Sequence, residues 1–185
     1  MQMSALNTIF ILVLAFLAVF IEASFGTFRR LLGVQVDLLP GLMVYASLSA
    51  GIPTVSFVAI LGGLWFDSLS ANQLGVSILP LFVIGFAVRQ FSHLILRDQS
   101  YAQLVLGFSA SGFAPLLTLI ILFSCGEEPI IGLGFIWQWL VMTLIGGLLV
   151  PIYFKLFDKV YRTLGYERIA ETSFREDREI KRGRK

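Results

Sequence analysis

The chain has 185 residues, of which 57% are hydrophobic and only 14% are charged, and its mean hydropathy is +0.84. In a soluble domain about a quarter of all residues are charged. Of the 26 charged residues in this chain, 16 lie from Lys155 onward. The rest of the chain cannot cover a water-soluble surface with so few charges. We therefore expect an integral membrane domain over residues 1–164 and a charged cytoplasmic tail over residues 165–185.

The first three predicted helices occupy residues 5–69. Ala5–Phe25 is predicted as a retained transmembrane helix, because it is longer than a signal peptide and lacks a basic n-region. Asp37–Ala50 and Pro53–Leu69 are predicted as two short helices, because Gly51-Ile52-Pro53 is a typical helix stop and restart. Their expected lengths of about 21 and 25 Å fall short of a hydrocarbon core about 30 Å thick.

Three further apolar segments are long enough to cross a bilayer. They are Gln73–Phe91, Ala102–Ser124 and Ile130–Phe157, and the last is expected to tilt or to bend near Pro151. The predicted fold class is an all-α integral membrane protein, a six-helix transmembrane bundle with helices 2 and 3 short.

The charge distribution predicts the orientation. A basic C-terminal tail belongs in the cytoplasm, and with six crossings the N-terminus lies there too. Arg29 and Arg30 then fall outside, against the positive-inside rule. A single crossing over residues 37–69 would place both arginines inside, so this alternative stays open beside the favoured double crossing.

Three predicted helices carry small or polar residues on one face. Such stripes allow close helix packing in lipid, and a substrate pathway or a partner helix is the alternative. The residues are Ala15, Ala18 and Glu22; Ser56, Ala59, Gly63, Asp67 and Ser70; and Gln103, Gly107, Ser111, Ala114 and Thr118.

The ionisable residues near the helix ends are the candidate site residues. Asp67 precedes a polar turn, where it is expected to accept backbone hydrogen bonds, with partner or ligand binding as the alternative; Asn72 is a candidate N-cap of the next helix. Asp37 is predicted to cap the second helix. Glu22 is predicted to form an internal pair, with Arg29 or Arg30 as its partner.

Motifs of known enzymes are missing from the sequence. It contains no G-x-x-x-x-G-K-[ST], no G-x-S-x-G and no H-E-x-x-H. Cys125 is the only cysteine and His93 the only histidine, which excludes an internal disulfide and sites built from paired histidines. We expect a protein that is not an enzyme, needs no cofactor or metal and binds no nucleic acid.

A set of short motifs resembles a known family. Asp37-Leu38-Leu39-Pro40 opens a short helix, Gly62-Gly63-Leu64 leads to Asp67-Ser68-Leu69, and Leu74-Gly75 opens the next apolar segment. Over residues 5–157 this pattern resembles the rod shape-determining protein family MreD.

The resemblance implies a subunit of the bacterial cell-elongation complex in the inner membrane. Its partners would be MreC directly, and MreB and the elongation peptidoglycan synthases, RodA and its transpeptidase, indirectly, besides membrane lipids. Asp67, Gly62, Gly63, Gly75, Asp37 and Glu22 are the candidate partner-binding or structural residues.

The family's fold is also similar to that of substrate-binding subunits of energy-coupling-factor vitamin transporters, which supplies the alternative function. Such a subunit needs an outer cavity lined by aromatic and polar side chains. Trp65, Trp137, Gln138 and Trp139 are the candidates for that lining.

Overall fold

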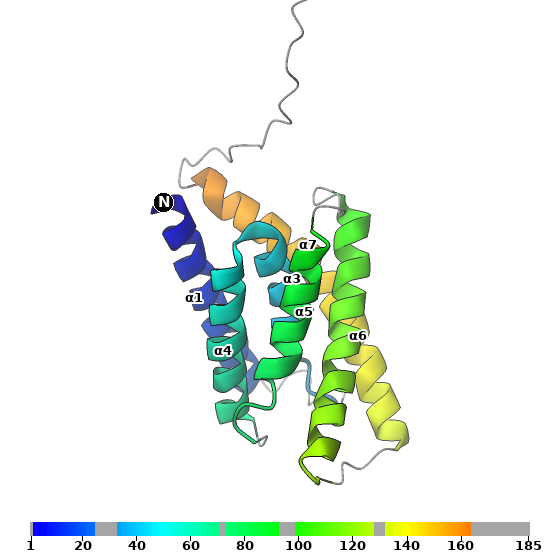
Figure 1. The fold of residues 1–185 in the computed structure, drawn as a ribbon. Coiled ribbons are helices and arrows are strands. Elements are labelled where there is room, and N and C mark those ends of the chain that lie inside the picture. The colour runs from blue at the N-terminus through cyan, green and yellow to red at the C-terminus, as the bar shows by residue number, and fades with distance from the viewer. Residues whose placement is uncertain (1, 25–32, 71–72, 93–98, 128–131, 164–185) are drawn as a thin grey trace, which may run out of the picture.

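The computed structural model describes residues 2–24, 33–70, 73–92, 99–127 and 132–163, and within these ranges the chain is all-helical (Figure 1). The six helices confirm the predicted number. Their bounds are α1 Gln2–Ser24, α3 Leu39–Ser49, α4 Ile52–Leu69, α5 Ile78–Gln90, α6 Ser100–Ser124 and α7 Leu133–Thr163.

Successive helices run in opposite directions (Figure 1). Asn7, near the start of α1, donates a side-chain hydrogen bond to the carbonyl of Ser49, at the end of α3. Thr8 is likewise hydrogen-bonded to Thr54, at the start of α4, at 2.7 Å. Residues 37–69 therefore form two helices that turn back at this end, as the stop and restart at residues 51–53 predicted.

Four of the helices are long and apolar enough to span a membrane. The spans are Asn7–Ser24, Ile52–Leu69, Ser100–Ser124 and Leu133–Val160. They identify the chain as a membrane protein. The shorter apolar helices are α3 and α5, with 11 and 13 residues.

Helix lengths correct two predictions. The third predicted helix is α4, which has 18 residues and counts among the possible spans, so it is not one of the short helices. The fourth predicted helix is α5, which was expected to begin at Gln73 but begins at Ile78, because residues 74–77 form turns instead of helix. The last helix begins at Leu133 and continues to Thr163 with Pro151 inside it.

The short helix α3 forms the centre of the bundle. All of its residues from Leu39 to Leu48 are buried, and it contacts every other helix. Tyr45 stacks on Phe157 with ring centroids 4.0 Å apart and meets Phe154 edge-on at 4.9 Å. An apolar helix buried on all sides is typical of an internal position in a membrane protein.

The small-residue stripes are used for packing inside the chain. Ala15 and Ala18 of α1 are buried, as are Ala59 and Gly63 of α4. On α6 the buried residue Gly107 faces Gly147 of α7 so closely that an added Cβ would lie 2.9 Å from the Gly147 Cα. The packing interpretation is therefore confirmed for these positions.

Candidate functional site at the acidic end

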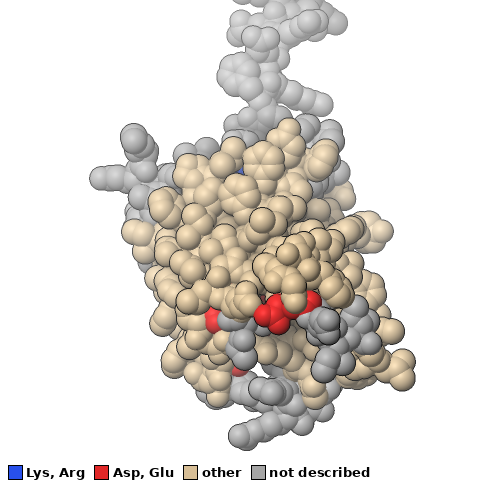
Figure 2. All heavy atoms as spheres, turned by 60° about the horizontal axis from the view of Figure 1, so that its bottom comes forward, with Lys and Arg blue, Asp and Glu red and all other residues tan. Residues whose placement is uncertain are grey.

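Four acidic residues lie near one end of the bundle, which we name the acidic end. They are Glu22, Asp37, Asp67 and Glu127. Helices α1, α4 and α6 finish at this end, at the bottom of Figure 1. Figure 2 shows red carboxylate groups on this face with no blue Lys or Arg beside them among the described atoms.

Asp67 ties the end of α4 to the start of α5. Its side chain is only 2% exposed. One carboxylate oxygen accepts hydrogen bonds from the N–H groups of Gly75 at 2.7 Å and Ser77 at 3.2 Å, and the other accepts the Ser77 hydroxyl at 2.6 Å. These are the backbone bonds that the turn-fixing interpretation expected. The helix begins directly after Ser77, while the candidate cap Asn72 lies outside the described residues.

The glycines of the motif have distinct positions around this turn. Gly75 has φ +96°, a conformation that favours glycine over residues with a side chain. A Cβ on Gly63 would lie 3.0 Å from the Cα and N of Ile78, so α4 and α5 touch through their backbones. A Cβ on Gly62 would meet only the Leu39 side chain, at 3.4 Å.

Asp37 lies in the segment that leads into α3. Its Oδ1 accepts a hydrogen bond from the N–H of Leu39 at 2.8 Å, so it holds the first turn although the helix starts two residues later than predicted. Burial raises the pKa of the Asp37 carboxyl to about 7; the Leu39 bond opposes this rise and the negative Asp67 adds to it.

Glu22 lies at the end of α1, close to the same segment. Gln35 donates a side-chain hydrogen bond to its Oε1 at 3.4 Å, and its Oε2 is buried without a hydrogen-bond partner among the described residues. The predicted partners Arg29 and Arg30 lie outside the described residues. Sequence reasoning had not identified Gln35.

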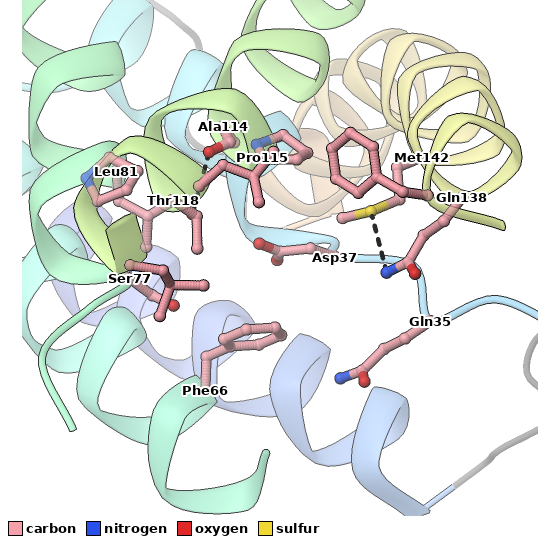
Figure 3. A pocket seen from close by; sticks show the side chains of 14 residues that line it. Gln35, Asp37, Phe66, Ser77, Leu81, Ala114, Pro115, Thr118, Gln138 and Met142 are labelled. Carbon is pink, nitrogen blue, oxygen red and sulfur yellow. Dashed lines mark hydrogen bonds between the residues drawn. The ribbon is translucent and has the colours of Figure 1, made fainter. Parts of the chain in front are cut away.

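A cavity of about 220 Å³ opens among α4, α5, α6, α7 and residues 33–38 (Figure 3). The Asp37 carboxylate points into it, and Gln35, Ser77, Thr118 and Gln138 also line it. Phe66, Leu81, Pro115 and Met142 supply part of its apolar wall. Because Ser77 also bonds Asp67, the Asp67 turn forms part of the cavity rim.

Of the four residues expected in such a cavity, only Gln138 lines it. Trp139 instead donates its indole N–H to the carbonyl of Gly112 at 2.8 Å and joins α7 to α6. Trp65 packs edge-on against Phe16 of α1, with centroids 5.3 Å apart. Trp137 is 54% exposed, as suits an interface anchor.

The two loops of the acidic end are also joined. Gln73 donates a side-chain hydrogen bond to Glu127 at 2.7 Å, which links the loop after α4 to the end of α6. Across the described part of the chain, no three His, Cys, Asp or Glu side chains are grouped so that they could hold a metal ion. The arrangement offers fixed loops around a partly polar cavity.

Comparison with known proteins gives no relative: no protein-family model, curated protein or solved structure matches the chain.

Proposed function

We propose that the chain is a non-catalytic membrane subunit of the bacterial cell-elongation complex that binds MreC and so helps to regulate peptidoglycan synthesis and cell shape. The observation that carries this proposal is the convergence of the three motif segments that resemble MreD. Residues 37–40, 62–69 and 74–75 meet at one junction of α3, α4 and α5. Motifs that are separated in sequence but joined in space behave as one structural unit.

The use of the carboxylates also favours a subunit without catalysis. Both oxygens of Asp67 are occupied by hydrogen bonds within its own loop, and Asp37 binds the first turn of α3. A general acid or base needs an oxygen within reach of a substrate. At Asp67 that reach is blocked by Gly75 and Ser77.

The partner would contact the outward faces of the bundle, because the small-residue stripes are already buried inside it. Among the described helices α1 packs closely on α3 and α4 and meets α7 through the edge-on contact of Phe10 with Phe157, and it lies at the edge of the bundle (Figure 1). Its outward side carries bulky apolar residues, among them Ile9, Phe16 and Phe20, exposed by 45 to 56%. A single partner helix such as that of MreC would fit beside α1 in the membrane.

The cavity favours a second candidate function, that of a substrate-binding subunit of an energy-coupling-factor vitamin transporter. It combines apolar walls with a few converging polar groups, which is typical of small-molecule sites. In this alternative the partner would be a transporter ATPase module instead of MreC.

Affinity purification from gently solubilised membranes distinguishes the two candidates. We expect MreC to co-purify with the tagged chain, and depletion of the chain to make rod-shaped cells round. Recovery of an ATPase module without MreC would support the transporter subunit and refute the elongation subunit. An unrelated tagged membrane protein of similar size is the control for detergent-dependent carry-over.

A further inference from the structure

The cavity at the acidic end reaches far into the bundle. Ala114 of α6 contributes to its wall, ten residues before the helix ends at Ser124. At 1.5 Å per residue this is a depth of about 15 Å, half of a typical hydrocarbon core. On the same helix the polar lining residue Thr118 lies six residues before that end, a depth of about 9 Å. Polar groups inside the hydrocarbon region are costly and mark functional sites by default.

Its size fits a small organic molecule. An apolar protein cavity of about 150 Å³ holds benzene, and this cavity measures about 220 Å³. There is space for one ring with a short polar chain. Phe66, Leu81, Pro115 and Met142 give the ring an apolar wall, and Phe66 stands directly below the Asp37 carboxylate in Figure 3.

The charge around the cavity is negative. Asp37 projects into it, and Glu22 and Asp67 are close enough for repulsion between Glu22 and Asp37 and between Asp37 and Asp67 to be felt. The described basic side chains belong to the other end: Arg89 donates a hydrogen bond to the carbonyl of Ser47 near the end of α3, and Lys155 lies near the end of α7.

We propose that this cavity binds a small organic cation, whose ammonium group faces the Asp37 carboxylate and whose apolar body lies against Phe66, Leu81 and Met142. The side-chain carbonyl oxygen of Gln138 and the hydroxyl oxygen of Thr118 accept hydrogen bonds from the other N–H groups of the ammonium group. A cation would offset the repulsion between the Asp37 and Asp67 carboxylates, which is the source of the selectivity for charge.

Binding of the cation depends on the charge of Asp37. Because burial raises the pKa of Asp37 to about 7, the carboxylate is mostly ionised at pH 8 and mostly neutral at pH 6. The groups that face it are Asp67 on α4, which repels its charge, Glu22 on α1, and Tyr153 on α7, which donates to the carbonyl of Leu38. A protonated amine should therefore bind more tightly at pH 8 than at pH 6.

The test compares phenethylamine with 2-phenylethanol, which has the same ring and chain but no charge, by calorimetric titration of the purified full chain in detergent. We expect the amine to bind at pH 8 with a dissociation constant on the order of 1 mM or below, at least about tenfold tighter than the alcohol. Asp37→Asn keeps an oxygen for the Leu39 N–H and should lose this preference. Glu127→Gln removes one charge from the same end outside the cavity and should keep it.

Equal affinity for amine and alcohol, no binding of either, or unchanged preference in Asp37→Asn would overturn the proposal. An ammonium group can come from a free solute or from a lipid headgroup. Native mass spectrometry with phosphatidylethanolamine and phosphatidylglycerol separates these sources. If the chain retains phosphatidylethanolamine alone and Asp37→Asn loses it, the ammonium group comes from the lipid. If only the free amine binds, it comes from a solute. The site would serve either proposed function, and its failure would leave the MreC experiment unaffected.

Discussion

Replacing Asp67 by alanine removes the link between α4 and α5. The carboxylate accepts three hydrogen bonds, from the Gly75 N–H and from the N–H and hydroxyl of Ser77. Hydrogen bonds to a charged group contribute about 1.5–3 kcal/mol each, and buried donors left unpaired cost about 1–3 kcal/mol. Water can reach the half-buried Gly75 more readily than Ser77, which is buried in the wall of the cavity. We expect Asp67→Ala to lower the free energy of unfolding by about 3–5 kcal/mol.

Amide hydrogen exchange of the loop measures this effect locally. A loss of about 3 kcal/mol corresponds to roughly a 100-fold faster exchange at Gly75 and Ser77, together with a lower thermal unfolding midpoint in detergent. The control is Ser68→Ala, because the adjacent Ser68 is exposed and, among the described residues, its hydroxyl bonds the carbonyl of Leu64 in its own helix. If Asp67→Ala exchanged and unfolded like Ser68→Ala, the carboxylate would not hold the turn and the reasoning would be refuted.

Three more predictions concern the same end of the bundle. Gly63→Ala should destabilise the chain by about 1–3 kcal/mol because its Cβ meets the Ile78 backbone, whereas Gly62→Ala should be near neutral; equal unfolding midpoints would contradict this packing. The folded-state pKa of Asp37 lies above its ordinary value of 3.8, so its contribution to stability should fall as pH rises from about 4 to 7. In Asp37→Asn the thermal unfolding midpoint should change less with pH over this range. If its pH dependence matched that of the wild type, the Asp37 carboxyl would not be the group that makes stability depend on pH. Cys125 directly follows α6 at the acidic end, which lies outside when the C-terminal end of α7 is cytoplasmic, so its exposed thiol should react with a membrane-impermeant maleimide added to intact spheroplasts; labelling only after lysis would reverse the predicted orientation.

The number of helices was predictable from the sequence, but the start of α5 was not. The apolar run from Gln73 to Phe91 is continuous, so hydropathy alone predicts one long helix. Gly75 instead adopts a positive φ, and the hydrogen bonds that Asp67 accepts from Gly75 and Ser77 hold the loop as turns until Ser77. These contacts join residues eight to ten positions apart, which a periodic pattern does not record.

The candidate site was predictable only in part. The sequence identified Asp67 and Asp37 as carboxylates that bind backbone N–H groups, because turn residues and helix starts have local signatures. The cavity depends on how α6 and α7 approach residues 33–38, and tryptophan content suggested the wrong lining residues. Thr118 had been named in a small-residue stripe with a substrate pathway as the alternative, but Gln35 carries no local signal for a cavity and became a candidate only when the helices were placed together.

Binding of the purified chain to purified MreC in lipid nanodiscs tests the central claim most directly, with native mass spectrometry as the readout. We predict a complex that contains both proteins with the wild-type chain and with Ser68→Ala, and a weakened one with Asp67→Ala. A wild-type chain that forms no complex with MreC under these conditions would contradict the proposal that this bundle serves the elongation complex.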